Sequence, residues 1–218
     1  MQLINAAPAL QETDELRADI FAMLAALLRN GPSSEMLDWL SELEPEQGDD
    51  GAMAKAWSAL ALAAQHINVQ QAADEYQELF IGIGRGELMP FGSWYLTGSL
   101  METPLVALRQ DLAQLGYQRQ QDVYEPEDHI AAQCEVMNLM ISSGHGYGPQ
   151  QTFWKRHIAP WASRFFKDLQ QAKGAAFYSA VGLLGEAFAE QEDNYYLQLS
   201  PAALGTGADH NNNPGDLT

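Results

Sequence analysis

Acidic side chains and a histidine gather in one twelve-residue stretch, YEPEDHIAAQCE at Tyr124–Glu135, directly before an apolar helical pattern. Carboxylates and an imidazole in one place can exchange protons with a substrate, bind a metal ion, or accept strong hydrogen bonds from a cationic partner. Glu125 and His129 are four residues apart and can face each other on a helix, whereas Asp128 and His129 are adjacent and cannot. The stretch by itself leaves these chemistries open.

The same residues can also be explained as the start of a helix without any function. Pro126 suits the first helical position, and Glu127 and Asp128 then lie in the first turn, where unpaired amides and the helix dipole favour carboxylates. Asp128 could also reach back to the amide of Glu125, as in a capping box. The pattern therefore predicts a helix that begins at Pro126 and runs to about Ser143.

Other motifs that would indicate an enzyme are absent from the sequence. The five histidines form no HExxH pair, and none lies at zinc-finger spacing from the single cysteine, Cys134. The run GIGRGE at Gly82–Glu87 is not a dinucleotide-binding GxGxxG motif, and no phosphate-binding GKS or GKT sequence occurs. There is no GxSxG elbow, and Cys134 shares an apolar helical stripe with Ile130 and Met137, which favours a place in the core.

A second candidate surface is the glycine-rich stretch at residues 81–103, which is long for a plain connection between helices. Its large apolar side chains are Met89, Phe91, Trp94 and Tyr95, with Phe80 just before it. The rings could fill the space between helices, because aromatic side chains are mostly buried. They could also line an apolar groove near the acids, which would suit a peptide with a basic and an apolar segment.

Helical periodicity dominates the rest of the chain, with no strand alternation and no internal repeat. We expect helices at residues 12–29, 34–43, 51–67, 70–80, 103–115, 126–143, 152–173 and 175–191, and a loop at 144–151. Gly31 suits the left-handed position that ends many helices, Gly116 stops another, and Pro160 bends the helix in which it lies. The predicted class is all-α, a bundle of about eight or more helices.

The polar stretch Gln118–Tyr124 indicates a hinge near the EPEDH segment. We therefore expect an N-terminal lobe at residues 1–122, which includes the aromatic loop 81–103, and a C-terminal lobe at residues 123–200. Residues 201–218 have the composition of a flexible tail. A hinge between lobes also permits their exchange between chains, so a monomer and a domain-swapped dimer both stay open.

The charge of the chain restricts its partners. Eleven Lys and Arg against 29 Asp and Glu give a net charge of −18, which repels nucleic acids and favours cationic partners. One cysteine allows no internal disulfide, and the N-terminus lacks the features of a signal peptide. The longest apolar run, Phe21–Leu28, is too short to cross a membrane. These features predict a soluble, cytoplasmic protein without stable membrane insertion.

Two blocks of the sequence resemble the TorD/DmsD family of redox-enzyme maturation chaperones. The first is YQELFIGIGRGELMPFGSWYLTGSL followed by PLVALRQDL, and the second is EPEDHIAAQCEVMNLM. The resemblance is sharp over about residues 76–140 and diffuse on either side. After DHI the family is usually more apolar than the AAQCE found here.

The resemblance implies an all-helical fold that binds a guest, with no catalysis and no cofactor of its own. Family members bind the apoprotein of a molybdenum oxidoreductase and its twin-arginine signal peptide, and they hold back export until the molybdopterin cofactor is inserted. The glycine-rich loop looks closest to members associated with formate dehydrogenases, and a dimethyl sulfoxide or trimethylamine N-oxide reductase is the other expected type of client. The peptide-binding residues implied are Leu79, Phe80, Pro90, Phe91, Gly92, Ser93, Trp94, Tyr95, Glu125, Pro126, Asp128 and His129.

Elementary chemistry agrees with this implication. A twin-arginine signal carries two guanidinium groups and an apolar run, and Glu125 and Asp128 could each offer arginine a charge-assisted bond of about 1.5–3 kcal/mol. Two alternatives stay open. One is a helical enzyme or nucleotide-binding protein that uses Glu125, Asp128 and His129, and the other is a purely structural helical subunit.

Overall fold

The described part of the chain is helical, as the sequence predicts. The computed structural model describes residues 11–44, 50–82, 86–120 and 123–199, so the expected tail at 201–218 lies outside the described residues, as do Gln121 and Asp122 of the expected hinge. The α-helices are α1 (Glu12–Arg29), α2 (Ser34–Ser41), α3 (Ala52–Gln65), α4 (Val69–Tyr76), α5 (Gly92–Thr97), α6 (Thr103–Gln114), α7 (Ile130–Ser142), α8 (Tyr147–Phe153), α9 (Ala159–Gln171) and α10 (Phe177–Gln198). Two π-helical turns, η1 (Gln77–Ile81) and η2 (Trp154–Ile158), continue α4 and α8.

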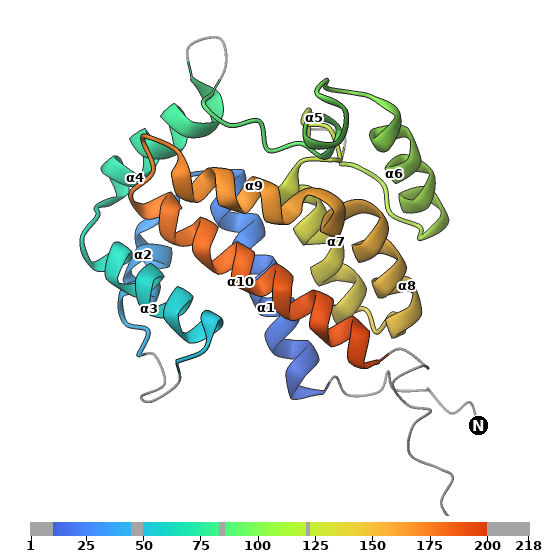
Figure 1. Ribbon diagram of the computed structural model, residues 1–218, viewed down its shortest axis with the longest axis horizontal. Helices are drawn as coiled ribbons and strands as arrows, with labels where there is room; N and C mark the ends of the chain where they lie inside the picture. Colours follow the sequence, from blue (N-terminus) through green and yellow to red (C-terminus); the bar gives the residue numbers. More distant parts are fainter. Residues whose placement is uncertain (1–10, 45–49, 83–85, 121–122, 200–218) are drawn as a thin grey trace, which may run out of the picture.

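Helices α1 and α10 form the centre of the bundle (Figure 1). Helix α1 packs against α7 along most of its length, and α10 packs against α9 on one side and α3 on another. The short α5 lies against both α6 and α9. The first and last long helices therefore meet in the same core, and α5 and α6 are attached at one end of it.

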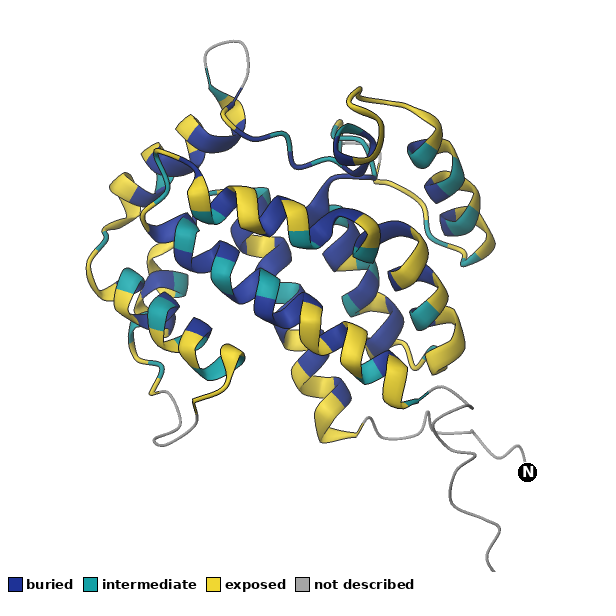
Figure 2. Ribbon diagram, in the orientation of Figure 1, coloured by how far each residue is buried: buried dark blue, intermediate teal, exposed yellow. Residues whose placement is uncertain are grey.

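One apolar core joins these helices, and the buried positions follow their inward faces (Figure 2). In it the rings of Phe21, Trp154 and Phe188 pack edge to face, with centroids 6.1 Å apart for Phe21 and Trp154 and 4.7 Å apart for Phe21 and Phe188. These side chains come from both sides of the expected boundary between residues 122 and 123. The division into two lobes stays a prediction.

Two of the expected helix ends illustrate what local sequence can and cannot indicate. Gly116 follows α6 with a φ of 82°, the left-handed conformation expected of it. The same expectation is wrong for Gly31, which is absent from the residues with positive φ. A Cβ at Gly31 would lie 3.1 Å from the Cα of Ala73, so glycine here permits the close approach of α4.

Three segments differ from the predicted elements in kind, and α10 extends beyond the expected end at residue 191 to Gln198. The expected loop at 144–151 contains the start of α8 at Tyr147, and the stretch 81–103 contains α5. The expected helix at 152–173 is divided by the π-helical turn η2 directly before α9. Pro160 has no amide hydrogen to donate to the turn before it, and the wider turn accommodates this loss.

The described ranges contain neither a membrane-spanning helix nor a cluster of metal ligands. No helix there is both long enough and apolar enough to span a bilayer. In the same ranges, His, Cys, Asp and Glu side chains nowhere gather in threes as the ligands of a metal ion would.

Candidate functional site

The two sequence blocks meet at a short backbone contact. Phe91 and His129 form an isolated antiparallel bridge, and the amide of Ile130 donates to the carbonyl of Pro90 at 2.9 Å. The rings of Phe91 and His129 stand edge to face with centroids 5.0 Å apart. The aromatic stretch and the EPEDH segment are therefore neighbours, although nearly 40 residues separate them in the chain.

Asp128 fixes the start of α5. Its carboxylate Oδ2 accepts from the amide of Ser93 at 2.8 Å, and its carbonyl accepts from the amide of Gly92 at 2.8 Å. A carboxylate there satisfies amides that the first turn of a helix leaves unpaired. Asp128 is only 2% exposed, so its carboxylate faces the interior of the protein. Its Oδ1, like the nearby Gln133 Oε1, has no hydrogen-bond partner among the described residues.

His129 caps α7 and remains neutral. Its Nδ1 accepts from the amide of Ala131 at 3.1 Å, and the residue is 2% exposed. Burial, with a smaller effect of the Arg29 charge, lowers the pKa of His129 to about 3. An imidazole that stays neutral and bonded to the backbone cannot serve as an acid or base at neutral pH.

The predicted start of α7 is therefore wrong in detail. The helix begins at Ile130 rather than Pro126, and Asp128 caps α5 instead of reaching back to Glu125. The carbonyl of Pro126 accepts from the amide of His129 at 3.1 Å, which closes a turn before the helix. The contact with the first sequence block holds this turn in place, and the local pattern contains no sign of that contact.

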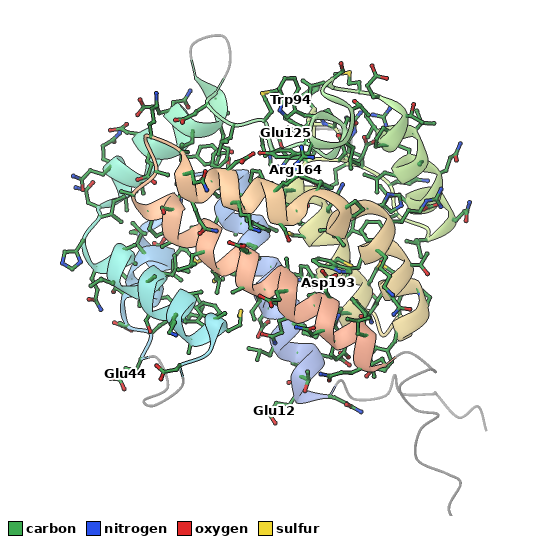
Figure 3. The ribbon with its side chains drawn as sticks, in the orientation of Figure 1. Glu12, Glu44, Trp94, Glu125, Arg164 and Asp193 are labelled. Atoms are coloured by element: carbon green, nitrogen blue, oxygen red, sulfur yellow. The ribbon has the colours of Figure 1, made fainter. Side chains whose placement is uncertain are left out.

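The twelve expected site residues divide by exposure. Buried are Leu79, Phe80, Pro90, Gly92, Ser93, Tyr95, Asp128 and His129, and half-buried are Phe91, Trp94, Glu125 and Pro126. Among the buried residues, Phe80 packs with Tyr76 and Tyr178 in the core, at ring distances of 5.1 and 5.4 Å. Only the four half-buried residues offer surface to a partner, and Figure 3 shows Trp94 and Glu125 at the same end of the molecule.

Tyr95 connects α5 to α9. Its hydroxyl donates to Asp168 Oδ2 at 2.9 Å, its ring packs against Trp161 at 5.4 Å, and its carbonyl accepts from Arg164 at 2.8 Å. Burial, followed by the hydrogen bond to Asp168, raises the pKa of the Tyr95 hydroxyl, which stays protonated. Tyr95 thus holds the first block in place from inside the protein.

Cys134 lies in the core, as predicted. It is 2% exposed on the stripe of α7 that also buries Ile130 and Met137. Burial raises the pKa of its thiol to about 12, so the reactive thiolate does not form at neutral pH. This environment removes the candidate nucleophile.

Two hollows border the EPEDH segment. One, of about 580 Å³, is lined by α1, by α7 and by the segment that follows α6, from Tyr117 to Gln120 and at Val123, with Glu125 and Glu127 also in its lining. The other, of about 410 Å³, lies between α5, α6 and η2 and reaches Gly92 and Asp128. The first hollow also contains Arg29 and Glu135, which are not among the expected site residues. The sequence indicates them only weakly: Arg29 is a charge at the end of a helix, and Glu135 is a charge within an otherwise apolar helix.

Comparison with known proteins identifies relatives. The family model described as nitrate reductase delta subunit matches residues 46–167, more than half of the chain. A chaperone protein TorD from Vibrio cholerae is 26% identical over 207 residues, which cover 85% of this chain and 94% of the relative. A Tat proofreading chaperone DmsD from Salmonella paratyphi A is 29% identical over 134 residues, which cover 60% of this chain and 65% of the relative.

A solved structure agrees on the fold. The crystal structure of a redox enzyme maturation protein from Archaeoglobus fulgidus superimposes with a TM-score of 0.51 over 86% of this chain and 99% of that chain, at 15% identity. The relatives are named as chaperones rather than as catalysts. With both sequence blocks inside the matched range, the chain belongs to the TorD/DmsD family of redox-enzyme maturation chaperones, the family whose model is described as nitrate reductase delta subunit.

Proposed function

We propose that the protein is a cytoplasmic chaperone for a molybdenum oxidoreductase. It binds the apoprotein and its twin-arginine signal peptide, and it holds back export until the molybdopterin cofactor has been inserted. The observation that carries this proposal is the family match over residues 46–167, a range that contains both sequence blocks. The name Tat proofreading chaperone, given to the Salmonella relative, supports a guest that leaves by the twin-arginine route.

The exposed part of the site has the chemistry that such a guest requires. Glu125, whose side chain is 41% exposed, supplies a carboxylate for a guanidinium group. Phe91 and Trp94 are half-buried, and Trp94 lies at the same end of the molecule as Glu125 (Figure 3). An apolar segment would be stabilised by burial against these rings at about 25 cal/mol per Å² of area, less the cost of ordering the peptide.

The buried members of the site have an indirect role in this proposal. Asp128 is enclosed and bonded to the start of α5, so it orients Trp94 rather than meeting the guest itself. The net charge of −18 attracts a basic peptide from a distance and speeds encounter at low salt. The client we propose is of the formate dehydrogenase or dimethyl sulfoxide reductase type, bound by a monomer or a domain-swapped dimer.

Calorimetry with a pair of peptides tests the proposal. We expect a signal peptide with its Arg-Arg pair intact to bind more tightly than the same peptide with Lys-Lys, because the planar fork of arginine matches a carboxylate and the ammonium of lysine does not. Added salt should weaken the binding of both peptides. Equal heats for the two peptides, or no heat for either, would contradict the proposal.

A further inference from the structure

The hollow between α1 and α7 has a charged end and an apolar end. The two helices are antiparallel, because Arg29 at the end of α1 meets Glu135 of α7, whereas Asp14 at the start of α1 meets Tyr147 just after α7. Figure 1 shows the same opposite course. Going back along α1 from Arg29 and forward along α7 from Glu135 therefore leads in the same direction, away from the charges.

Arg29 bridges two carboxylates at the charged end. Its Nε and Nη2 donate to the two oxygens of Glu135, both at 2.8 Å, and its Nη1 lies 3.4 Å from Glu125 Oε2. The bond to Glu135 is the paired fork that guanidinium groups make with carboxylates, whereas the contact with Glu125 is long. One internal arginine thus occupies two acids, and it satisfies only one of them well.

The charges around the hollow are balanced, so an incoming cation has to compete with an internal one. Three carboxylates, those of Glu125, Glu127 and Glu135, meet three guanidinium groups, those of Arg29 and Arg119 in the lining and that of Arg109 beside Glu127. Glu127 is already held by Arg109 at 2.8 Å and by Arg119 at 3.8 Å. Glu125 and Glu135, with side chains 41% and 50% exposed, are the acids that an incoming arginine could reach.

Away from Arg29 and Glu135, the two helices line the hollow mainly with small and apolar side chains. These are Ala22, Ala25 and Ala26 of α1 and Val136 and Leu139 of α7, with Asn138 as a polar neighbour. Ala22 precedes Arg29 by seven residues, or roughly 10 Å along the helix, which is the length of about three residues of extended chain. Leu139 is 48% exposed and so offers apolar surface to a guest. The chemistry fits an arginine next to a short apolar run.

We propose that this hollow seats the arginine and adjoining apolar residues of the guest, and that Arg29 is a built-in competitor for the guest arginine. The inference rests on the function proposed above and adds a place and a control of affinity to it. Arg29 forms a partly exposed ion pair with Glu135, and such pairs are weak enough for a guest arginine to replace Arg29 in them. The cost of that displacement lowers the affinity, which would let the guest be released.

The decisive variant is Arg29→Gln, measured with the Arg-Arg peptide by calorimetry. It frees Glu125 and Glu135 for the guest, so we expect binding about threefold to tenfold tighter than that of the unaltered protein. The matched control is Lys167→Gln, which also removes one positive charge and breaks an exposed ion pair, that with Glu186. The control changes the overall field by the same one charge as Arg29→Gln, but it leaves the acids of the hollow paired. It should therefore bind within about twofold of the unaltered protein.

A second pair of variants keeps the test valid if Arg29→Gln alters the fold. Glu135→Gln removes an acid of the hollow, whereas Glu186→Gln removes an acid of the control pair. We expect Glu135→Gln to weaken peptide binding by about threefold to tenfold relative to Glu186→Gln. Circular dichroism of each variant monitors the helices.

The outcomes separate this inference from the function on which it rests. If the unaltered protein binds the peptide and Arg29→Gln binds no more tightly than Lys167→Gln, the competitor role is wrong and the proposed function stands. If Glu135→Gln matches Glu186→Gln, the hollow is not the seat of the guest arginine. If no variant binds the peptide, the proposed function is wrong and the inference is lost with it.

Discussion

His129 makes the stability of the protein depend on pH. In the unfolded chain an imidazole has a pKa of about 6.5, whereas burial lowers the pKa of His129 in the fold to about 3. As the pH falls from 6.5 to 3, the unfolded state therefore binds a proton that the folded state does not bind. His129 thus removes stability as the solution is acidified, by at most about 1.4 kcal/mol per pH unit.

The substitution His129→Asn isolates this effect. Asparagine is a good N-cap and can accept from the Ala131 amide, but it does not titrate. We expect the free energy of unfolding of this variant to fall less steeply between about pH 6 and pH 4 than that of the unaltered protein. Urea unfolding at a series of pH values measures both slopes. Carboxylates titrate equally in the two proteins, so parallel curves would mean that His129 is not the cause.

The contact between the two sequence blocks was predictable from the sequence, but the exposure of their residues was not. The resemblance implied that the stretch around Phe91 and the stretch around His129 act together, and they are bridged. Yet acids are mostly exposed and histidines intermediate in exposure, whereas Asp128 and His129 are buried and each caps a helix. The backbone amides that attract them belong to neighbours that only the folded chain brings close.

At the scale of elements, the crossing of α9 and α10 depends on glycine. A Cβ at Gly185 would lie 2.2 Å from Cε1 of Phe166, and a Cβ at Gly182 would lie 2.9 Å from the carbonyl oxygen of Phe166. Two helices can approach this closely only where a side chain is missing. The close contact then buries Phe166 and Phe165 of α9 against the centre of the bundle.

Gly185→Ala tests the crossing. The added methyl group must displace the Phe166 ring, so we expect the free energy of unfolding to fall by about 1–3 kcal/mol. The control is Gly148→Ala in α8, where a Cβ meets nothing within 4 Å and alanine favours the helix, with a gain of up to about 1 kcal/mol. Thermal or urea unfolding compares the two. A loss at Gly148 as large as that at Gly185 would contradict this account.

Helices with a regular apolar stripe were predicted well, and the misses share one cause. The limits expected for the first helix are those of α1, Glu12–Arg29. The start of α8 was missed because glycine and proline at Tyr147–Pro149 look like a loop, although Pro149 lies in the first turn, where no amide donor is needed. The π-helical turn before Pro160 and the turn before α7 were missed as well. They depend on residues that are neighbours in space, and the spacing of apolar residues along the sequence does not indicate them.

At the scale of the whole molecule, a buried charge cluster joins the first long helix to the last. Arg17 of α1 is 1% exposed, and its Nε and Nη2 donate to the two oxygens of Glu192 in α10 at 2.6 and 2.8 Å. It also donates to Asp14 at 2.8 Å and to the Tyr196 hydroxyl at 2.7 Å. Burial raises the pKa of Glu192, so that carboxylate depends on Arg17 for its charge.

Arg17→Met would break this connection and report on the unity of the fold. Two carboxylates, Glu192 and Asp14, would stay enclosed without their cation, so we expect a loss of about 3–5 kcal/mol in the free energy of unfolding. The control is Arg156→Met, which breaks a more exposed pair with Asp111 and should cost at most about 1 kcal/mol.

Circular dichroism and tryptophan fluorescence should follow the same unfolding transition in both variants, because α1 shares its core with α7 and α10. Fluorescence reports all five tryptophans, of which Trp39, Trp57 and Trp94 precede residue 123 and Trp154 and Trp161 follow it, whereas circular dichroism reports all helices together. Lobes that fold alone would each contribute a transition of their own to both signals. Two separated transitions in Arg17→Met would therefore favour independent lobes at residues 1–122 and 123–200, and one shared, earlier transition would favour a single cooperative unit.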